Sequence, residues 1–522
     1  MSIPRYIMAL DLGTTGNRAM VFDRAGQRVG QAYRELTQHY PQPGWLEHDP
    51  SEIWQAVCWA MHAAVRDAAI EPREIAALGL TVQRETCLLW DKTTGQPLHR
   101  AIVWQDRRTA ALCDQLRAAG KAEWIYDKTG LVLDAYFSAT KLNWLLNHLA
   151  AAGTPVNLET TLAGTVDAWI LWNLTGGQVH ATDPSNASRT MLLNLATQAW
   201  DSELLELFGL AAELLPEVRP SLGDFGNLER SILGVEIPIS AVLGDQQAAL
   251  FAHGCDRPGL LKCTYGTGSF LVAHTGSEVV RVKQLLSTIA WSQSAPEANP
   301  RNAHPSNAHP HRLSVGYALE GAIFTSGACI QWLRDGLKLI DHADETEVLA
   351  QQVSHTHGVY FVPALSGLGA PHWDMSARGA FLGLTGGAQR AHLVRAVLEA
   401  IAFQVKEVID AINLGCATPI TRLKVDGGAC QNNFLMQFQA DVLGIPVERP
   451  QILDATVQGI AFAAGLAIGF WHDYDSLIAT RQVDRVFEPK IAPLATSAVA
   501  TEHFARWQQA VEHTKHWTDA SR

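Results

Sequence analysis

Short apolar runs alternate along this chain with segments of helical periodicity. Residues 389–412 and 432–443 repeat apolar positions at the spacing of an amphipathic helix. The runs typical of strands are Ile7–Leu10, Ala77–Val82, Leu88–Trp90, Leu261–Thr264, Phe270–Ala273, Val359–Val362 and Leu423–Val425. Strands that alternate with helices in this way predict an α/β fold.

Two segments half a chain apart share one local pattern. Residues 7–23 and residues 260–272 each form an apolar run, a turn rich in Gly and Thr, and a second apolar run. The chain has 522 residues, well above the roughly 250–300 at which a single core stops growing. We therefore expect two domains of similar architecture, at residues 1–253 and 254–522.

Composition narrows the class of protein. Hydrophobic residues make up 47% and charged residues 18% of the chain, which predicts a folded protein with a large core. The net charge is −12 without any run of Lys or Arg, so a nucleic-acid partner is not expected. No stretch approaches the roughly 18 apolar residues of a membrane helix, and Tyr6–Leu10 is too short for a signal peptide. These features predict a cytoplasmic protein without membrane insertion, and its eight cysteines, which form no CxxC pair, are expected as buried reduced thiols.

Two further segments carry structural predictions. Ser292–Arg312 contains Pro, Asn, Ser and His without periodicity, which predicts a long exposed loop and leaves a histidine metal site as the alternative. Glu502–Trp517 predicts a closing amphipathic helix docked on the second domain. Its apolar positions are Phe504, Trp507, Val511 and Trp517.

The Gly/Thr turns at residues 13–16 and 266–268 have the composition of phosphate-binding turns. Their backbone N–H groups can converge on an anionic oxygen, and small residues let a phosphate approach closely. Asp11 stands where it can hold Mg²⁺ through water, and Arg18 where it can reach a transferred phosphoryl group. Such a turn can also be purely structural, so each turn alone leaves both interpretations open.

A third element favours nucleotide binding. Residues 423–429 form an apolar strand that closes on Asp-Gly-Gly, and a helix follows whose N-terminus faces the same turn. Two Gly/Thr hairpins followed by this element resemble the nucleotide clamp of actin, the chaperone ATPases and hexokinase. The chain lacks a Gly-x-x-x-x-Gly-Lys-Ser/Thr loop, so a Walker-type site is not indicated.

Polar residues at the ends of predicted strands are candidates for substrate binding. The strand Ala77–Val82 runs into Gln83-Arg84-Glu85-Thr86, a cation beside an anion that can bind polyol hydroxyls or simply form a surface ion pair. Asp245 follows an apolar stretch and starts a helix, so it is either a helix cap or the base that accepts a hydroxyl proton. Trp104 and Phe270 are either apolar walls of a pocket or core residues.

The whole chain resembles the glycerol branch of the sugar-kinase family, which also contains xylulose, gluconate and fucose kinases. Three motifs are specific to that branch: Gln-Arg-Glu-Thr at 83–86, Asp-x-Tyr-Phe-Ser around Tyr136, and Gly-Asp-Gln-Gln-Ala-Ala from Gly244. The other matching segments are Asp11–Thr15 with Arg18, Val103–Gln105, Arg107–Thr109, Gly164–Trp169, Asn186–Met191, Thr264–Gly268, Tyr317–Gly321, Gly367–Trp373 and Asp426–Gln437.

The resemblance implies two actin/hexokinase-like ATPase domains with a cleft between them, and transfer of a phosphoryl group from ATP to glycerol to give sn-glycerol 3-phosphate. It implies Asp245 as the general base, Asp11 and Asp245 near Mg²⁺, and a homodimer or homotetramer. The implied glycerol contacts are Arg84, Glu85, Trp104, Tyr136, Asp245, Gln246 and Phe270. The implied contacts to ATP or ADP are Thr14, Thr15, Arg18, Thr267, Gly327, Gln331, Gly428 and Asn432.

Some positions depart from the family pattern. Gly16-Asn17 stands where the glycerol branch usually has Ser-Ser, and Ala135 and Ala139 replace the usual Pro and Gly around Tyr136. Residues 230–236 contain neither a Gly-rich fructose bisphosphate loop nor a phosphorylatable His, so neither control is expected. Two alternatives remain: a kinase for another polyol or sugar, and an actin-like or chaperone-like ATPase that needs no small acceptor.

Overall fold

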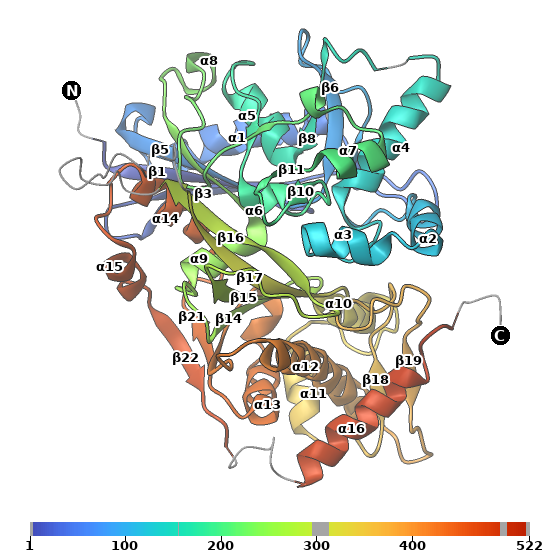
Figure 1. The fold of residues 1–522 in the computed structure, drawn as a ribbon. Helices are drawn as coiled ribbons and strands as arrows, with labels where there is room; N and C mark the ends of the chain where they lie inside the picture. Colours follow the sequence, from blue (N-terminus) through green and yellow to red (C-terminus); the bar gives the residue numbers. More distant parts are fainter. Residues whose placement is uncertain (1–3, 155, 295–312, 491–497, 518–522) are drawn as a thin grey trace.

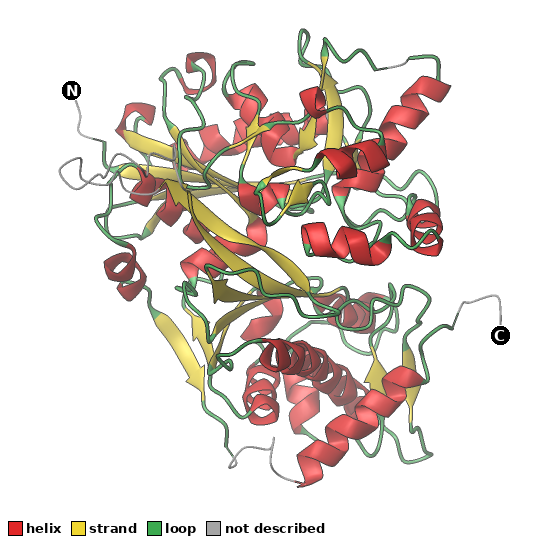
Figure 2. Cartoon of the chain, viewed as in Figure 1, coloured by secondary structure: helices red, strands yellow, loops and turns green. Residues whose placement is uncertain are grey.

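The computed structural model describes residues 4–154, 156–294, 313–490 and 498–517. Two large mixed sheets with helices on their faces form a two-domain α/β fold, as predicted (Figures 1 and 2). The first sheet contains, in order, β13 (Ile239–Gly244), β5 (Ile75–Val82), β1 (Tyr6–Leu12), β2 (Gly16–Phe22) and β3 (Arg28–Glu35). The second contains β16 (Leu286–Ser294), β17 (Leu313–Ile323), β15 (Ser269–Gly276), β14 (Leu260–Tyr265), β20 (Arg422–Asp426), β21 (Val447–Pro450) and β22 (Val483–Phe487).

The two sheets share one arrangement of five central strands, to which the second sheet adds β16 and β22 at its edges. In the first, the antiparallel strands β1, β2 and β3 are followed by β5 and β13, which extend the sheet in parallel on the other side of β1. In the second, β14, β15 and β17 are antiparallel, and β20 and β21 extend the sheet in parallel beyond β14. The repeated pattern of the two Gly/Thr hairpins therefore corresponds to a repeated fold.

The helices cover the faces of these sheets and build the regions between them. A smaller sheet of β4 (Glu47–His48), β7 (Ala101–Ile102), β6 (Cys87–Asp91) and β8 (Thr161–Thr165) carries the outer lobe of the first half. The longer helices of the first half are α1 (Pro50–Asp67), α2 (Ala110–Ala118), α3 (Ala122–Thr129), α4 (Ser138–Ala151), α5 (Val166–Leu174) and α9 (Asp245–Ala252). Those of the second half are α10 (Gly327–Asp335), α12 (Arg390–Gly415), α13 (Asn433–Leu443), α14 (Ala455–Ala467) and α16 (Ala498–Glu512).

Helices α9 and α14 join the two halves. α14 follows β21 of the second sheet but packs on β1, β5 and β13 of the first, where it crosses α9. A Cβ atom at Gly459 would lie 1.8 Å from the carbonyl oxygen of Ala248, so only glycine allows the helices to approach this closely. The helix that starts at Asp245 is thereby held between the two sheets.

The C-terminal helix confirms most of one prediction and corrects the rest. In α16, Trp507 and Val511 are buried in a cluster with residues of β18 (Tyr360–Val362) and α12. The helix ends at Glu512, five residues before Trp517, whose side chain is 70% exposed. The prediction that Trp517 lies on the docked face is wrong because the chain has left the helix by that point.

The predicted histidine-bearing loop is shorter at its start than expected. Strand β16 continues to Ser294, so residues 292–294 belong to the sheet rather than to the loop. His304, His309 and His311 lie outside the described residues. All eight cysteines are free thiols; six are buried as predicted, whereas Cys58 and Cys416 are only partly buried. Within the described ranges no helix is long and apolar enough to cross a membrane.

Candidate active site

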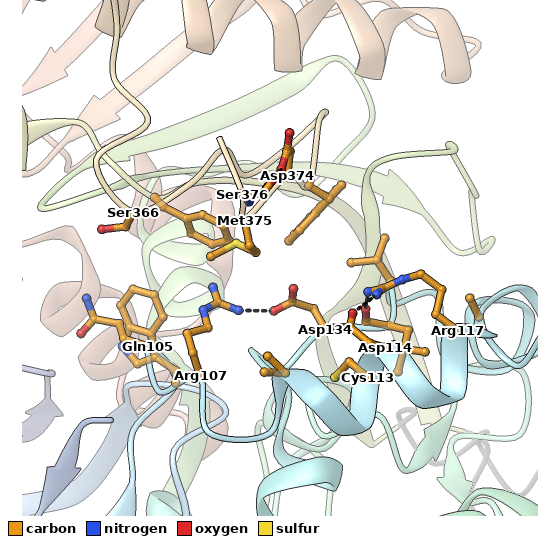
Figure 3. Close-up of a pocket in the computed structure, with 18 of the residues that line it drawn as sticks. Gln105, Arg107, Cys113, Asp114, Arg117, Asp134, Ser366, Asp374, Met375 and Ser376 are labelled. Atoms are coloured by element: carbon orange, nitrogen blue, oxygen red, sulfur yellow. Dashed lines mark hydrogen bonds and ion pairs between the residues drawn. The ribbon is translucent and has the colours of Figure 1, made fainter. Parts of the chain in front are cut away.

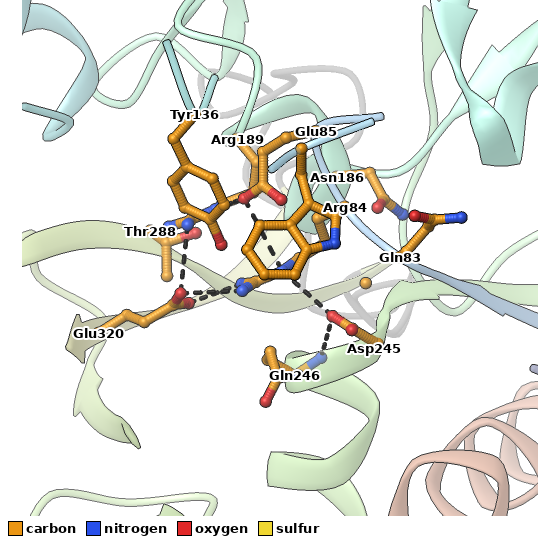
Figure 4. A network of polar contacts seen from close by, with 12 residues as sticks. Gln83, Arg84, Glu85, Tyr136, Asn186, Arg189, Asp245, Gln246, Thr288 and Glu320 are labelled. Atoms are coloured by element: carbon orange, nitrogen blue, oxygen red, sulfur yellow. Dashed lines mark hydrogen bonds and ion pairs between the residues drawn. The ribbon is translucent and has the colours of Figure 1, made fainter. Parts of the chain in front are cut away.

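The ends of β5 and β13 bring Arg84 and Asp245 together. These strands are parallel neighbours in which Val82 pairs with Gly244, so the residues that follow them meet at one edge of the sheet. Nε of Arg84 lies 3.2 Å from Oδ1 of Asp245 (Figure 4). Arg84 is 3% exposed, which rules out a surface ion pair with Glu85. The helix-cap interpretation of Asp245 is also wrong, because Gly244 is the N-cap of α9 and Asp245 is its first residue.

Glu85 turns inward from the same loop. Its backbone is left-handed, with φ of 61°, a conformation that costs a non-glycine residue energy and is typical of functional sites. Its carboxylate accepts a hydrogen bond of 2.6 Å from Nε of Arg189, and both side chains are buried. Burial raises the pKa of Glu85, while the charges of Arg189 and Arg84 lower it.

A buried carboxylate from the second half completes this network. Glu320 of β17 accepts bonds of 2.6 and 2.8 Å from the two terminal nitrogens of Arg84, and Nη2 of Arg189 lies 3.1 Å from its Oε1. Burial would raise the pKa of Glu320, but the charges of Arg189 and Arg84 hold it at about 2. The sequence analysis missed Glu320 and Arg189. A single charge inside the apolar strand Val315–Ile323 was the available signal.

Three aromatic rings pack together beside these charges. The ring of Trp104 meets Tyr136 edge to face at a centroid distance of 5.5 Å and Phe270 at 5.9 Å. Phe270 belongs to β15, so residues of both halves build the wall. Nε1 of Trp104 donates a 2.8 Å hydrogen bond to Oγ1 of Thr14, which connects the wall to the first Gly/Thr turn. Burial raises the pKa of Tyr136 well above its usual value, so its hydroxyl stays protonated.

Gln246 follows Asp245 and is held by a buried lysine. Nζ of Lys262 donates to the side-chain oxygen of Gln246, to Oγ1 of Thr264 at 3.0 Å and to the carbonyl oxygen of Phe270 at 3.3 Å. Burial lowers the pKa of Lys262, whereas the charge of Asp426 raises it. Sequence reasoning did not single out Lys262. Its place in an apolar strand, four residues before the Gly/Thr turn that starts at Gly266, was the available indication.

The candidate nucleotide residues of the second half lie at one edge of its sheet. Thr264 pairs with Asp426, so the turn that contains Thr267 adjoins the Asp-Gly-Gly turn. The backbone N–H groups of Ser326 and Gly327, at the start of α10, donate to this turn at 2.9 and 3.0 Å. Four candidates are surface-accessible in this structure: Thr15, Thr267, Gln331 and Gly428.

Asn432 and Arg18, also candidate nucleotide residues, are engaged with other side chains. Asn432 caps α13, and its Nδ2 donates a 3.0 Å bond to Oγ1 of Thr346. Arg18 on β2 forms an ion pair with Asp454, the N-cap residue of α14, which the sequence analysis missed. The side chains of Asn432 and Arg18, which were expected to contact a nucleotide, are therefore bonded to other residues of the protein.

Asp11, the last residue but one of β1, pairs with Arg18 of β2. The pKa of Asp11 is raised to about 7, chiefly by burial; the charge of Arg18 opposes this rise, while the charges of Asp245 and Asp454 add to it. The carboxylates of Asp245 and Asp454 are thus close enough to affect the pKa of Asp11. Among the described residues, no group of three or more His, Cys, Asp or Glu side chains is arranged to hold a metal ion by itself.

A cleft of about 1450 Å³ opens beside these aromatic rings, between α2 and α3 of the first half and residues 365–378 of the second (Figure 3). Trp104 and Phe324 line its inner end. Arg107 forms an ion pair with Asp134 there, and its guanidinium lies 5.4 Å from the ring centre of Phe324. The cleft reaches the aromatic wall from solvent, as expected for the opening between two actin-like domains.

A cluster of charged side chains beside aromatic rings, between the two halves of an actin-like fold, is the arrangement expected of a small-molecule kinase. The comparisons agree. Residues 6–252 match the N-terminal domain of the FGGY family of carbohydrate kinases, and residues 261–468 match the C-terminal domain of that family. The chain belongs to the FGGY family of carbohydrate kinases.

Glycerol kinases are among the proteins of that family that are similar to this chain. The chain is 65% identical over 520 residues to a glycerol kinase of Acaryochloris marina, covering 99% of this chain and 100% of that protein. It is 48% identical to glycerol kinase 2 of Thermotoga maritima, over 98% and 99% of the two chains. The crystal structure of Plasmodium falciparum glycerol kinase with ADP superimposes with a TM-score of 0.86, at 33% identity and 98% coverage of both chains. A ligand-bound xylulose kinase of Lactobacillus acidophilus has a TM-score of 0.84 at 22% identity over 98% and 99% of the two chains, and thus shares the fold.

Proposed function

We propose that this carbohydrate kinase transfers the γ-phosphoryl group of ATP to glycerol and releases sn-glycerol 3-phosphate and ADP. The observation that carries the proposal is the pairing of Arg84 with Asp245 close to the packed rings of Trp104, Tyr136 and Phe270. A pocket with charged hydrogen-bonding groups below and apolar rings beside them suits a short polyol. The 65% identity to a full-length glycerol kinase supports the same substrate.

Asp245 acts as the general base in this proposal. Phosphoryl transfer needs a carboxylate within reach of the attacking hydroxyl to take its proton, and Asp245 is the partly exposed acid of the buried network. Arg84, Glu85, Tyr136 and Gln246 hydrogen-bond the hydroxyls, while Trp104 and Phe270 flank the carbon chain. Because phosphoryl transfer depends mainly on positioning and charge neutralisation, closure of the cleft over the substrates is expected to exclude water.

The nucleotide occupies the edge of the second sheet in this proposal. The backbone turns supply N–H donors for its phosphates, and Arg18 exchanges Asp454 for the terminal phosphate. The proposed contacts are Thr14, Thr15, Arg18, Thr267, Gly327, Gln331, Gly428 and Asn432. The paired Gly/Thr turns at equivalent edges of two similar sheets support this assignment.

Asp11 and Asp245 would hold Mg²⁺, largely through water. Carboxylate oxygens are the ligands that this ion prefers, and the mutual electrostatic effect of the two acids fits a shared cation. Bound Mg²⁺ neutralises charge on the phosphates of the nucleotide. Asp11 would thus fix the position of the cation, while Asp245 remains available to the hydroxyl.

We further propose that residues 1–253 and 254–522 are the two domains, and that the protein works in the cytoplasm as a homodimer or homotetramer. The last strand of the first large sheet ends at Gly244, and the first strand of the second begins at Leu260, which supports the boundary. Eight free cysteines suit a reducing compartment. Light scattering during gel filtration gives the oligomeric mass, and a mass of 56.9 kDa would exclude the proposed assembly.

A panel of acceptors tests the proposed reaction. ADP release and product identity are measured with ATP, Mg²⁺ and glycerol, dihydroxyacetone, erythritol, xylulose or gluconate, beside a control without acceptor. Glycerol is expected to give the highest kcat/KM and sn-glycerol 3-phosphate as product. Preference for another acceptor would reassign the pocket to a neighbouring kinase, and ATP turnover without acceptor would favour an ATPase.

A further inference from the structure

Glu320 is the one carboxylate of the site's buried network that the proposed reaction leaves without a role. It lies on β17 of the second half, is 0% exposed, and bonds to Arg84 and Arg189 of the first half (Figure 4). A buried charge is costly unless it is fully paired, so this position has to be explained by what Glu320 does for its partners.

The contacts of Arg84 show that Glu320 fixes the orientation of its guanidinium group. A guanidinium carries five N–H groups in one rigid plane. Glu320 accepts from both terminal nitrogens of Arg84, and Oε1 of Gln247 accepts from Nη1 at 3.2 Å. Anchoring the terminal nitrogens fixes the whole plane, and the remaining edge, with Nε, faces Asp245 at 3.2 Å.

The charge balance points the same way. Arg84 and Arg189 face three carboxylates: Glu85, Glu320 and Asp245. Without the charge of Glu320, two buried cations would share Glu85 and Asp245. Arg84 could then rotate toward Asp245 and form a closer ion pair with it, which would occupy the acid that has to accept the proton of the substrate.

We propose that Glu320 is a positioning residue of the phosphoryl acceptor site: it clamps Arg84 from across the domain interface, so that Arg84 presents donors to the acceptor without sequestering Asp245. Glu320 acts through Arg84 and touches no substrate. This inference rests on the proposed function, because it explains how Arg84 and Asp245 keep the roles given to them there.

The test replaces Glu320 by Gln, which keeps the shape of the side chain and removes its charge. Glu320→Gln is expected to raise KM for glycerol and to lower kcat, each about tenfold, with KM for ATP unchanged within about twofold. Glu320→Asp keeps the charge on a shorter stem and is expected to restore part of the loss. The matched control is Glu399→Gln in α12, which removes another buried carboxylate, paired with Arg395 at 2.7 Å, outside the pocket. Its KM for glycerol should equal that of the native enzyme.

The outcomes separate positioning from a structural role. Native kinetics for glycerol in Glu320→Gln would overturn the inference, and so would equal losses toward glycerol and ATP with a fall in Tm like that of Glu399→Gln. If Glu320→Gln does not fold, Glu320→Asp decides the question through the same comparison of the two KM values. If the native enzyme prefers another acceptor, the proposed function fails, and these measurements with that acceptor still test Glu320.

Discussion

The two sides of the candidate site are built differently. On the acceptor side, Arg84, Glu85, Tyr136 and Gln246 are all buried, and they are bonded or packed to other side chains of the protein. On the nucleotide side, the candidates are mainly backbone turns with accessible residues, and the charged group Arg18 is paired with Asp454.

This difference follows from the chemistry of the two substrates. A short neutral polyol offers few contacts, so its binding cannot offset much reorganisation, and a rigid pocket reduces the entropy lost on binding. A triphosphate carries several charges and a large base, which can reorganise exposed turns and exchange ion pairs. We therefore expect acceptor-side substitutions to act on catalysis and glycerol affinity, and nucleotide-side substitutions to act on ATP affinity.

The largest effect is expected at Asp245. Asp245→Asn keeps the size of the side chain but cannot accept a proton at neutral pH, so kcat should fall by about 10²–10⁴-fold. Steady-state kinetics with saturating glycerol and ATP measures this change. An Asp410→Asn variant on the surface of α12, where Asp410 pairs with Lys406 at 2.8 Å, is the control and should keep native turnover. Near-native kcat in Asp245→Asn would refute the base assignment.

Lys141 provides a sharper test of the rigidity of the acceptor side. This buried lysine of α4 donates to the carbonyl oxygens of Ala135 and Phe137 at 3.1 and 2.9 Å, and also to that of Tyr136. Burial lowers its pKa, and its hydrogen bonds to the three carbonyl groups hold the loop that carries the Tyr136 ring. Lys141→Met keeps the apolar stem and removes the donors, so KM for glycerol should rise about tenfold while KM for ATP stays constant.

A lysine outside the pocket serves as the control for Lys141. Lys128 of α3 pairs with Asp201 at 2.7 Å in the same lobe, and Lys128→Met should leave both KM values unchanged. Equal rises in both KM values for Lys141→Met would mean that the loop supports the fold as a whole. That result would weaken the contrast between the two sides.

The sequence predicted the parts of the molecule that follow from local pattern. Strand β5 and helix α13 lie within a few residues of the predicted segments, and the two Gly/Thr hairpins occupy equivalent places in two sheets. Arg84 and Asp245 could be identified as candidates because each directly follows an apolar strand. Their contact depends on β5 and β13 being parallel neighbours, although 160 residues of chain separate Arg84 from the start of α9.

The remaining features depend on partners that are distant in the sequence. Glu320 lies 236 residues from Arg84, and Asp454 lies 436 residues from Arg18. Locally, Glu320 is only a single charged residue within an apolar strand, and its role follows from the two arginines that meet it. Likewise, the crossing of α14 onto the first sheet depends on the absence of a side chain at Gly459, which sequence periodicity does not reveal.

The smallest effect is expected at Asp454, and it tests the nucleotide side. The ion pair with Arg18 is about one-third exposed, and such pairs contribute only about 0–1 kcal/mol. Asp454→Asn releases Arg18 for the terminal phosphate, so KM for ATP should fall about two- to fivefold, with KM for glycerol unchanged. The Asp410→Asn variant again serves as the control. A rise in KM for ATP would mean that Asp454 orients Arg18 toward the nucleotide, and the nucleotide side would then be preassembled like the acceptor side.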